Sequence, residues 1–575
     1  MSKRTTAIVV GALACALAVT GCSTSSSGTG GGSASASGSG SSFYNINEHP
    51  YSALKQGGTL NFAVDEFTPQ KNAFNADGTI TTTEVWSWYN PQVIGFKPNG
   101  DLNPNPNYVT SVTPTTVNGN TVVTYELNPK AKYNDGTPID VTAFQNTWNA
   151  NSGKNTDFNA NSTDGYNRIT SVAAGKDNTE VVVTFDGVNP WWGGLFNNLL
   201  NPACNTVDCF NNGYVGTDLA SAHPEWGAGP YMLQSFDANA GTATLVPNPN
   251  WWGNPGKLDK ITITQRESTA TINAFVNGES DVVGAGTADY LKQVQAVPGT
   301  ETRTGANTAV YMLQLNSTSA PLTDITVRQA IMTGIDRGQI DQVRFQGMNY
   351  TEQFPGSFLL FSFQTGYQDN FSQVIPKADP AAAKTLLEGD GYALGSDGYY
   401  AKDGAQLAIS LTTFGDNANT KAMAQVVQQQ LKNIGINMTI DNQPSTAFST
   451  VMSQGAWQMN ISGFAQTDPF GVAYTCQIYC STSDPNYSGL NKSGTGTTEL
   501  DAEIHQMETL ATSDQQIQAA NAIEVKALKL YGLMPLFNGP TVYQAKSGLA
   551  NIGAGVFAGT QTPFGDFVEN IGYVS

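Results

Sequence analysis

The chain has 575 residues, with 46 acidic against 27 basic side chains and a formal net charge of −19. Only 13% of the residues are charged while 40% are hydrophobic, which excludes a disordered acidic chain and favours a globular protein of about two to four domains. The shortage of Lys and Arg argues against nucleic acid as a partner, and a content of three histidines argues against a metal site or a metal cofactor.

The N-terminus carries the pattern of an export signal. Lys3 and Arg4 precede an apolar run from Ala7 to Val19, which ends at small residues. A basic start, a short apolar stretch and a small-residue cleavage site predict a secretory signal peptide over residues 1–21. The apolar run is too short for a membrane-spanning helix.

A cysteine follows this signal directly. Gly21-Cys22 resembles the end of a bacterial lipobox, which implies cleavage before Cys22 and acylation of that cysteine. The alternative is an ordinary signal peptide with an incidental cysteine. Residues 23–42 contain only Ser, Thr, Gly and Ala, a composition typical of a flexible coil. Residues 22–42 are therefore predicted to tether a folded body to the cell membrane from outside the cytoplasm.

The body of the chain has the periodicities of a mixed α/β protein. Alternating apolar residues predict strands at Gly58–Val64, Thr121–Leu127, Val181–Phe185 and Thr242–Val246. Helical spacing and helix start signals predict helices at Thr326–Ile335, Pro380–Leu387, Ala422–Ile434 and Asp514–Tyr531. Residues 91–225 are poor in helix signals, whereas helices and strands alternate over residues 309–540.

Four cysteines remain in the body: Cys204, Cys209, Cys476 and Cys480. They allow three pairings, and the short spacings favour Cys204–Cys209 and Cys476–Cys480. A zinc site is the alternative. Zinc knuckles use tighter spacings, and export to an oxidising compartment favours disulfides.

Nine short segments occur in an order that marks a family. They are Gly57–Leu60, Tyr133–Ile139, Gly227–Tyr231, Asn248–Gly253, Lys257–Ile261, Asn277–Val282, Val327–Ile331, Leu431–Ile436 and Met534–Phe537. In type and order they resemble the family 5 extracytoplasmic solute-binding proteins of ABC importers, the oligopeptide and dipeptide binders. The resemblance covers the chain from residue 57 onward.

The resemblance implies an α/β, two-lobed clamp like the periplasmic binding proteins, with an additional subdomain on the first lobe. Lobe I would comprise 43–90, 226–308 and 541–575, the subdomain 91–225, and lobe II 309–540. In this family the ligand binds between the lobes, and the permease recognises the closed clamp. An extended peptide can be held there as an added strand through main-chain hydrogen bonds.

The expected ligand site departs from the family pattern. Peptide binders of this type carry, after an apolar strand of lobe II, an aspartate that pairs with the α-ammonium of the peptide. In the matching stretch, residues 460–469, that position falls on Gln466 or Thr467, depending on the placement of a gap. Asp468 resembles a later acidic residue that caps a loop. A neutral residue at the aspartate position predicts a different ligand end, unless the gap is misplaced.

Aromatic residues provide other candidates for the cleft. Trp86, Trp88, Trp457 and Phe464 offer platforms for sugar rings or apolar side chains, although Trp88 at helical spacing fits a core position equally well. The N–H groups of the threonine run before Trp86 are a further candidate, for a polar ligand end. The complete set of candidate ligand-binding residues is Thr82, Thr83, Trp86, Trp88, Trp457, Phe464, Ala465, Gln466, Thr467 and Asp468.

The common catalytic motifs are absent from the sequence: it has no Gly-x-Ser-x-Gly elbow, His-Glu-x-x-His, Walker A loop or dinucleotide fingerprint. We therefore expect a lipid-anchored, monomeric, non-enzymatic receptor that captures oligopeptides and delivers them to the permease subunits of an ABC importer. An oligosaccharide or another polar metabolite is the alternative ligand. An exported hydrolase with paired carboxylates is the alternative from another class.

Overall fold

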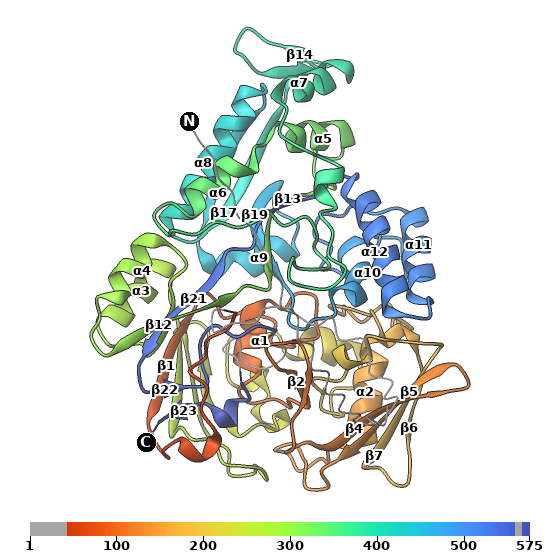
Figure 1. Ribbon diagram of the computed structural model, residues 1–575, viewed down its shortest axis with the longest axis vertical. Coiled ribbons are helices and arrows are strands. Elements are labelled where there is room, and N and C mark those ends of the chain that lie inside the picture. The colour runs from red at the N-terminus through yellow and green to blue at the C-terminus, as the bar shows by residue number, and fades with distance from the viewer. Residues whose placement is uncertain (1–42, 558–565, 575) are drawn as a thin grey trace, which may run out of the picture. The chain divides into compact units, whose positions relative to one another are not determined.

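The computed structural model describes residues 43–557 and 566–574. The predicted signal peptide, the tether and the lipidation site at Cys22 lie outside the described residues. The described chain is a mixed α/β protein, as predicted, and its strands form seven sheets (Figure 1). Its α-helices are α1 (Ile80–Trp86), α2 (Val141–Asn151), α3 (Ser268–Val276), α4 (Ala288–Gln295), α5 (Ile325–Gly334), α6 (Arg337–Arg344), α7 (Pro380–Gly389), α8 (Ala418–Asn433), α9 (Phe448–Ser453), α10 (Thr475–Tyr479), α11 (Thr498–Glu508) and α12 (Ser513–Leu528).

Two sheets combine segments that are far apart in the chain. The first has the order β1 (Thr59–Val64), β10 (Lys260–Gln265), β9 (Thr242–Pro247) and β8 (Tyr231–Asp237). The second has the order β11 (Val282–Gly284), β21 (Pro540–Lys546) and β12 (Thr300–Ala306). Strand β1 pairs with β10 in parallel, and alternate residues such as Leu60 and Phe62 point into a shared core. These two sheets therefore join early, middle and C-terminal parts of the chain.

A four-stranded antiparallel sheet lies within residues 91–225. Its order is β4 (Val109–Val117), β5 (Asn120–Leu127), β7 (Glu180–Phe185) and β6 (Ile169–Ala174). The alternation of β5 and β7 buries every second side chain, and these side chains form a core with residues of α2. Helix α2 begins at Val141 because the side chain of Asp140 accepts the N–H of Thr142.

A five-stranded sheet forms the centre of residues 309–540. Its order is β18 (Asn437–Gln443), β17 (Ala408–Phe414), β19 (Met459–Ala465), β13 (Ala309–Leu315) and β20 (Leu533–Phe537). Helix α8 lies beside β17 (Figure 1) and packs on β17 and β18. Its apolar side chains Val427 and Leu431 are fully buried. The remaining short strands are β2 (Ile94–Phe96), β3 (Leu102–Pro104), β14 (Ala393–Leu394), β15 (Tyr400–Lys402), β16 (Ala405–Gln406), β22 (Leu549–Ala550) and β23 (Gly572–Tyr573).

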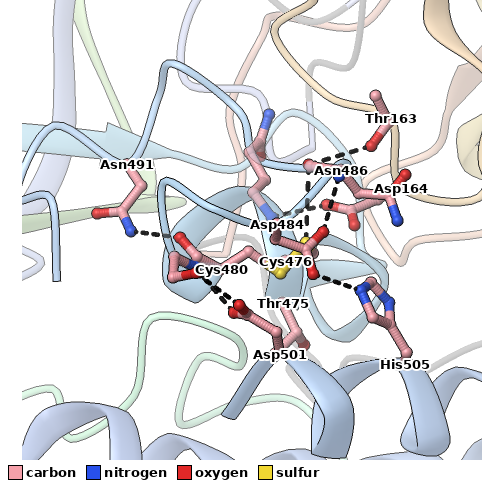
Figure 2. Close-up of a disulfide and its surroundings, with 12 residues drawn as sticks. Thr163, Asp164, Thr475, Cys476, Cys480, Asp484, Asn486, Asn491, Asp501 and His505 are labelled. Carbon is pink, nitrogen blue, oxygen red and sulfur yellow. Dashed lines mark hydrogen bonds and ion pairs between the residues drawn. A yellow bond between two sulfur atoms is a disulfide. The ribbon is translucent and has the colours of Figure 1, made fainter. Parts of the chain in front are cut away.

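Two disulfides are present, with the pairing that the spacings favour. Cys204 is joined to Cys209, and Cys476 is joined to Cys480. Figure 2 shows the second bond at the end of α10, where Asn491 donates to the carbonyl of Cys480 at 3.0 Å. Because the two sulfur atoms bond each other, they offer no thiolate to a metal. Within residues 43–557 and 566–574, no helix combines the length and apolarity that crossing a bilayer requires.

Candidate functional site

Strand β19 has a backbone edge that is only partly paired. On one side, β13 pairs with it over its whole length, from Ala309 opposite Ala465 to Leu315 opposite Met459. On the other side, β17 pairs with it only at Met459 and Asn460. Beyond Asn460, no strand of the described chain lies against this second side, although β19 is central in the sheet.

The antiparallel ladder decides which groups point to that side. Gln466 N–H donates to the carbonyl of Thr308 at 2.8 Å, which makes the even-numbered residues of β19 the ones bonded to β13. In an antiparallel pair the alternate residues direct their N–H and C=O groups the opposite way. Gly463 and Ala465 therefore direct theirs toward the open side, and both residues are solvent-exposed.

An aromatic pair lies beside this open edge. The ring of Tyr311, which is opposite Gly463 on β13, stacks on Phe537 of β20 with centroids 5.0 Å apart. A Cβ at Gly463 would lie 3.3 Å from Cε1 of Tyr311, so glycine keeps the strand backbone accessible next to the ring. An extended ligand can add here as a further strand, because the exposed donors and acceptors have no strand partner among the described residues.

The residues after β19 hold the turn that ends the strand. Gln466 is 6% exposed, and its Nε2 donates to the carbonyl of Phe358 at 2.8 Å, whereas its Oε1 has no partner among the described residues. Asp468 accepts the N–H of Phe470 at 2.8 Å and the hydroxyl of Tyr474, and burial raises its pKa to about 6. Asp468 therefore caps its own loop, which is the role that the sequence comparison favoured for it.

The threonines of α1 are used within the helix start. Thr79 N–H donates to Oγ1 of Thr82 at 3.1 Å, and that hydroxyl donates to the carbonyl of Gln70 at 3.1 Å. The N–H of Thr83 bonds the carbonyl of Thr79 at 3.4 Å. Because these groups already have partners in the chain, the helix start is a poorer ligand site than the threonine run suggested.

Three candidate tryptophans are buried. Trp88 has no exposed surface and packs between Phe62 and Tyr231, with ring centroids 5.9 Å from each. Trp86 is 2% exposed and packs on Tyr214. Trp457 is 4% exposed. The placement of Trp88 favours the alternative that it is a core residue.

Three other candidates lie along β19 or directly after it. Phe464 and Thr467 are half-buried, and Ala465 is exposed. The structure thus brings Phe464, Ala465, Gln466, Thr467 and Asp468 together on one strand and its turn. Trp88 lies in a separate hydrophobic core, and Trp86 lines a different cavity together with Thr82.

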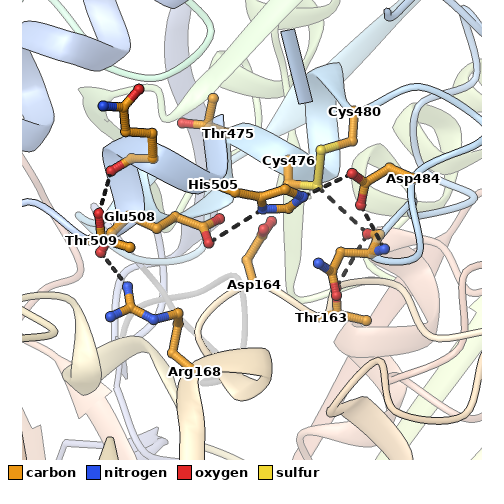
Figure 3. Close-up of polar contacts among 12 residues, drawn as sticks. Thr163, Asp164, Arg168, Thr475, Cys476, Cys480, Asp484, His505, Glu508 and Thr509 are labelled. Atoms are coloured by element: carbon orange, nitrogen blue, oxygen red, sulfur yellow. Dashed lines mark hydrogen bonds and ion pairs between the residues drawn. A yellow bond between two sulfur atoms is a disulfide. The ribbon is translucent and has the colours of Figure 1, made fainter. Parts of the chain in front are cut away.

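The segments predicted as subdomain and lobe II are joined by hydrogen bonds. Asp164 accepts the N–H of Gln477 at 2.9 Å, and the side chain of Gln477 returns a bond to the carbonyl of Asn161 at 2.9 Å. Thr163 Oγ1 donates to the carbonyl of Asn486 at 3.2 Å. Figure 3 shows Asp164 next to His505, which lies between Asp484 and Glu508. We call this set the Asp164 contact.

A second set of bonds joins the segments that follow β1 and β10 to α9 and the residues before it. Glu66 accepts the hydroxyl of Ser449 at 3.1 Å. Glu267 accepts both the N–H and the hydroxyl of Ser445, at 2.8 and 2.7 Å. The chain parts predicted as lobe I and lobe II therefore meet through carboxylate–serine bonds, and the open edge of β19 belongs to one of these parts.

Solved structures with the same fold define the class of protein. AppA of Bacillus subtilis, solved with a nonapeptide, superimposes with a TM-score of 0.77 at 17% identity, over 91% of this chain and 100% of that chain. The periplasmic EDTA-binding protein EppA superimposes with a TM-score of 0.76 at 23% identity, over 91% and 98% of the two chains. The fold is that of the two-lobed solute-binding proteins.

Sequence similarity narrows this class to one family. Residues 103–486 match the sequence model of the bacterial extracellular solute-binding proteins, family 5. The oligopeptide-binding protein OppA of Mycobacterium tuberculosis is 31% identical over 522 residues, which cover 89% of this chain and 85% of that protein. The chain belongs to family 5 of the bacterial extracellular solute-binding proteins, which serve ABC importers.

Sequence reasoning missed Tyr311 and Gly463 beside the open edge. A glycine inside a strand often marks a close approach of another backbone or of a ligand, so Gly463 was an available signal. Tyr311 becomes its neighbour only through the pairing of β13 with β19, which no single strand reveals.

Proposed function

We propose that this protein is the receptor of an ABC importer for oligopeptides, and that it binds them along the open edge of β19. A peptide in extended conformation would exchange hydrogen bonds with the backbone of Gly463 and Ala465. Its side chains would extend to either face of the added strand, where water can fill unused space. Such a site binds many sequences because the contacts are made by backbone atoms.

One observation carries this proposal: β19 is a central strand whose second edge is unpaired beyond Asn460. Unpaired strand edges are usually protected in soluble proteins. An edge kept open beside a stacked aromatic pair is therefore expected to serve binding. The similarity to OppA of Mycobacterium tuberculosis over most of both chains supports a peptide as the ligand.

The anchoring and assembly are part of the same proposal. We propose that Cys22 is acylated after cleavage of residues 1–21, so that a monomer remains at the outer face of the cell membrane. We propose that the chain divides into lobes I and II at the predicted boundaries. Hinge closure of these lobes around the ligand would be the change that the permease recognises. The protein would perform no catalysis, since its function lies in the difference in free energy between open and closed states.

Backbone recognition can be tested by removing a single N–H group. The exported full chain carrying Cys22→Ser is released from the membrane and titrated by calorimetry with short synthetic peptides and their backbone N-methylated counterparts. Ala465→Pro removes an N–H that no described residue uses, and Ala465→Val is the matched control because it keeps that N–H. We expect Ala465→Pro to weaken peptide binding by about 10-fold, equivalent to about 1.4 kcal/mol.

The control variant and the modified peptides separate backbone recognition from a general disturbance of the strand. Ala465→Val should bind peptides as tightly as the parent chain does. At least one N-methylated peptide should bind the parent chain weakly, with an affinity similar to that of the unmodified peptide for Ala465→Pro. Equal binding of methylated and unmodified peptides would contradict recognition through the strand edge. Absence of peptide binding altogether would contradict the peptide assignment.

A further inference from the structure

Two short crossovers connect the three-stranded sheet of β11, β21 and β12 with the five-stranded sheet. Strand β12 continues through Asn307 and Thr308 into β13. Strand β20 returns through Asn538 and Gly539 into β21. Because β12 pairs antiparallel with β21 and β13 pairs antiparallel with β20, the crossovers run side by side in opposite directions. A rotation of one sheet relative to the other therefore changes backbone dihedral angles in these four residues, which we call the hinge.

Side-chain amides hold the two crossovers together. Asn307 Nδ2 donates to the carbonyl of Asn538 at 2.9 Å. In return, Asn538 Nδ2 donates to the carbonyl of Ala309, at the start of β13, at 2.8 Å. The two crossovers are therefore coupled, and a group that fixes the conformation of one of them restrains both.

Glu352 supplies such a group, because its carboxylate binds the return crossover. Oε1 accepts the N–H of Asn538 at 2.8 Å, and Oε2 accepts the N–H of Gly539 at 3.0 Å. The hydroxyl of Tyr350 donates to Oε2 at 2.9 Å and so orients the carboxylate. Hydrogen bonds to an ionised acceptor are stronger than those between neutral groups. One carboxylate thus holds two successive N–H groups at the point where the chain passes between the sheets.

The backbone conformation at this point requires glycine. Gly539 has a φ of +73°, and a Cβ there would lie 3.1 Å from Cζ of Phe345. Phe345 in turn packs against Phe537 at the end of β20, with ring centroids 5.5 Å apart. A change of φ or ψ at Asn538 or Gly539 would turn at least one of the two N–H groups away from Glu352. Opening the hinge therefore breaks one or both of these hydrogen bonds.

The segment that ends in Glu352 also reaches the three-stranded sheet. Arg344, at the end of α6, donates through Nη1 to the carbonyl of Gly286 at 2.6 Å. Gly286 follows β11 of that sheet, whereas α6 contacts β20 of the five-stranded sheet. The segment from Arg344 to Glu352 therefore binds both sides of the hinge in the same conformation in which Glu66 bonds Ser449.

Building on the proposed function, we propose that Glu352 is a positioning residue of the clamp: it holds the return crossover in the conformation in which the lobes meet, and thereby slows the release of a captured ligand. It acts through the backbone of the hinge, whereas the proposed ligand contacts are at Gly463 and Ala465. Apparent affinity follows the population of the binding-competent conformation, so a residue can change affinity without contacting the ligand. Since the ligand leaves when the lobes separate, the effect should appear in the dissociation rate.

Dissociation kinetics measure this effect. The exported full chain carrying Cys22→Ser is loaded with a fluorescently labelled alanine pentapeptide, and its release into an excess of unlabelled peptide is followed by stopped flow. Glu352→Ala removes both acceptors and should speed release about 10-fold, equivalent to about 1.4 kcal/mol, while the association rate stays unchanged. Glu352→Gln keeps one acceptor oxygen and should give an intermediate rate.

Glu388→Ala is the matched control. Glu388 of α7 also accepts a tyrosine hydroxyl, that of Tyr400 at 2.7 Å, but it is exposed and none of its bonds within the described chain reaches the hinge. Its removal should leave the release rate unchanged. Release at the parent rate from both Glu352 variants, or equal acceleration by Glu388→Ala, would overturn the inference while leaving the peptide assignment in place.

Scattering from the ligand-free chain separates this inference from the proposed function. Small-angle scattering should give a larger radius of gyration for Glu352→Ala than for the parent chain, because the restraint on the hinge does not depend on the kind of ligand. If the peptide fails to bind the parent chain, the peptide assignment is contradicted and scattering alone decides the inference. A larger radius for the variant would then support it, and an unchanged radius would overturn it.

Discussion

The Asp164 contact predicts that ligand affinity depends on one carboxyl group at the boundary between predicted subdomain and lobe II. Asp164 is 2% exposed, and its Oδ2 accepts the N–H of Gln477 at 2.9 Å, whereas Oδ1 has no partner among the described residues. Asp164→Ala leaves the buried N–H of Gln477 without an acceptor when the two segments are in contact. When they separate, water replaces it.

The loss therefore falls on the closed state. A buried donor without a partner costs about 1–3 kcal/mol, and apparent affinity follows the population of the closed state, so Asp164→Ala should weaken ligand binding by about 5- to 150-fold. Asp164→Asn should weaken it much less, because the amide oxygen still accepts from Gln477 and its NH₂ group replaces the oxygen that has no partner. Asp208→Ala, an exposed residue of the same segment, is the control.

The same carboxyl group makes closure depend on pH. Burial, followed by the charge of Glu508, raises the pKa of Asp164 well above the ordinary value of 3.8, while the N–H of Gln477, the hydroxyl of Ser162 and the charge of His505 lower it. A group whose pKa is higher in the closed state than in the open state favours closure when the pH is below its pKa in the open state. That contribution is lost as the pH rises through its pKa in the closed state. Affinity should therefore fall as pH rises from about 4, and Asp164→Asn should remove this component.

Calorimetric titration with one binding peptide over a pH series measures the affinity, and the radius of gyration from small-angle scattering reports closure at each pH. The reasoning is refuted if Asp164→Ala binds as tightly as the parent chain. It is also refuted if Asp164→Asn keeps the parent's full pH dependence.

Three further predictions concern stability. Replacing both Cys476 and Cys480 by serine should lower the free energy of unfolding by about 2 kcal/mol, because the lost disulfide closes a short loop. Thermal unfolding under oxidising conditions measures the loss of stability, and an unchanged melting temperature would contradict the prediction. Glu524 is fully buried and accepts hydrogen bonds from the N–H of Phe358 at 2.7 Å, the side chain of Asn370 at 2.7 Å and the hydroxyl of Tyr479 at 2.8 Å. Glu524→Ala should therefore lower the free energy of unfolding by about 3 kcal/mol, measured by denaturant titration. A loss no larger than that of an exposed substitution would argue against this network. Hydrogen bonding to Glu508 and to Asp484 raises the pKa of His505 to about 9. The stability that this histidine contributes should therefore be complete below about pH 6.5 and lost as the pH rises through about 9. His505→Gln should flatten this part of the curve of unfolding free energy against pH, and an unaltered curve would exclude the pairing.

Regular elements were predictable wherever local signals decide them. Pro380–Gly389 begins as expected because Asp379 accepts the N–H groups of Ala381 and Ala382. Helix α8 begins at Ala418, earlier than its apolar spacing indicates, because Asn417 caps it and the first turn is polar. The helix predicted at Asp514–Tyr531 begins at Ser513 and ends at Leu528, and the side chain of Thr512 caps it by accepting the N–H of Gln515. Such differences arise at helix ends, where single hydrogen bonds determine the boundary.

The site was predictable only in part, because its defining features are relations between distant segments. The stretch from Phe464 to Asp468 was identified through its order in the family pattern, and the structure places it at the end of β19 and in the turn that follows. The open edge itself depends on where β17 stops pairing, which no periodicity in β19 reveals. Trp88 was a candidate because aromatics bind ligands, but Phe62 and Tyr231 from other strands enclose it.

The open edge of β19 also has a consequence for the empty protein in solution. A strand edge that accepts a peptide in extended conformation can equally accept an edge strand of another molecule, which is how sheets add together during aggregation. In the proposed binding mode the ligand covers this edge in the loaded receptor, whereas the empty receptor would leave it available whenever the lobes separate. Ligand occupancy would then protect the receptor from self-association, and chains stripped of ligand should associate at concentrations where loaded chains stay monomeric.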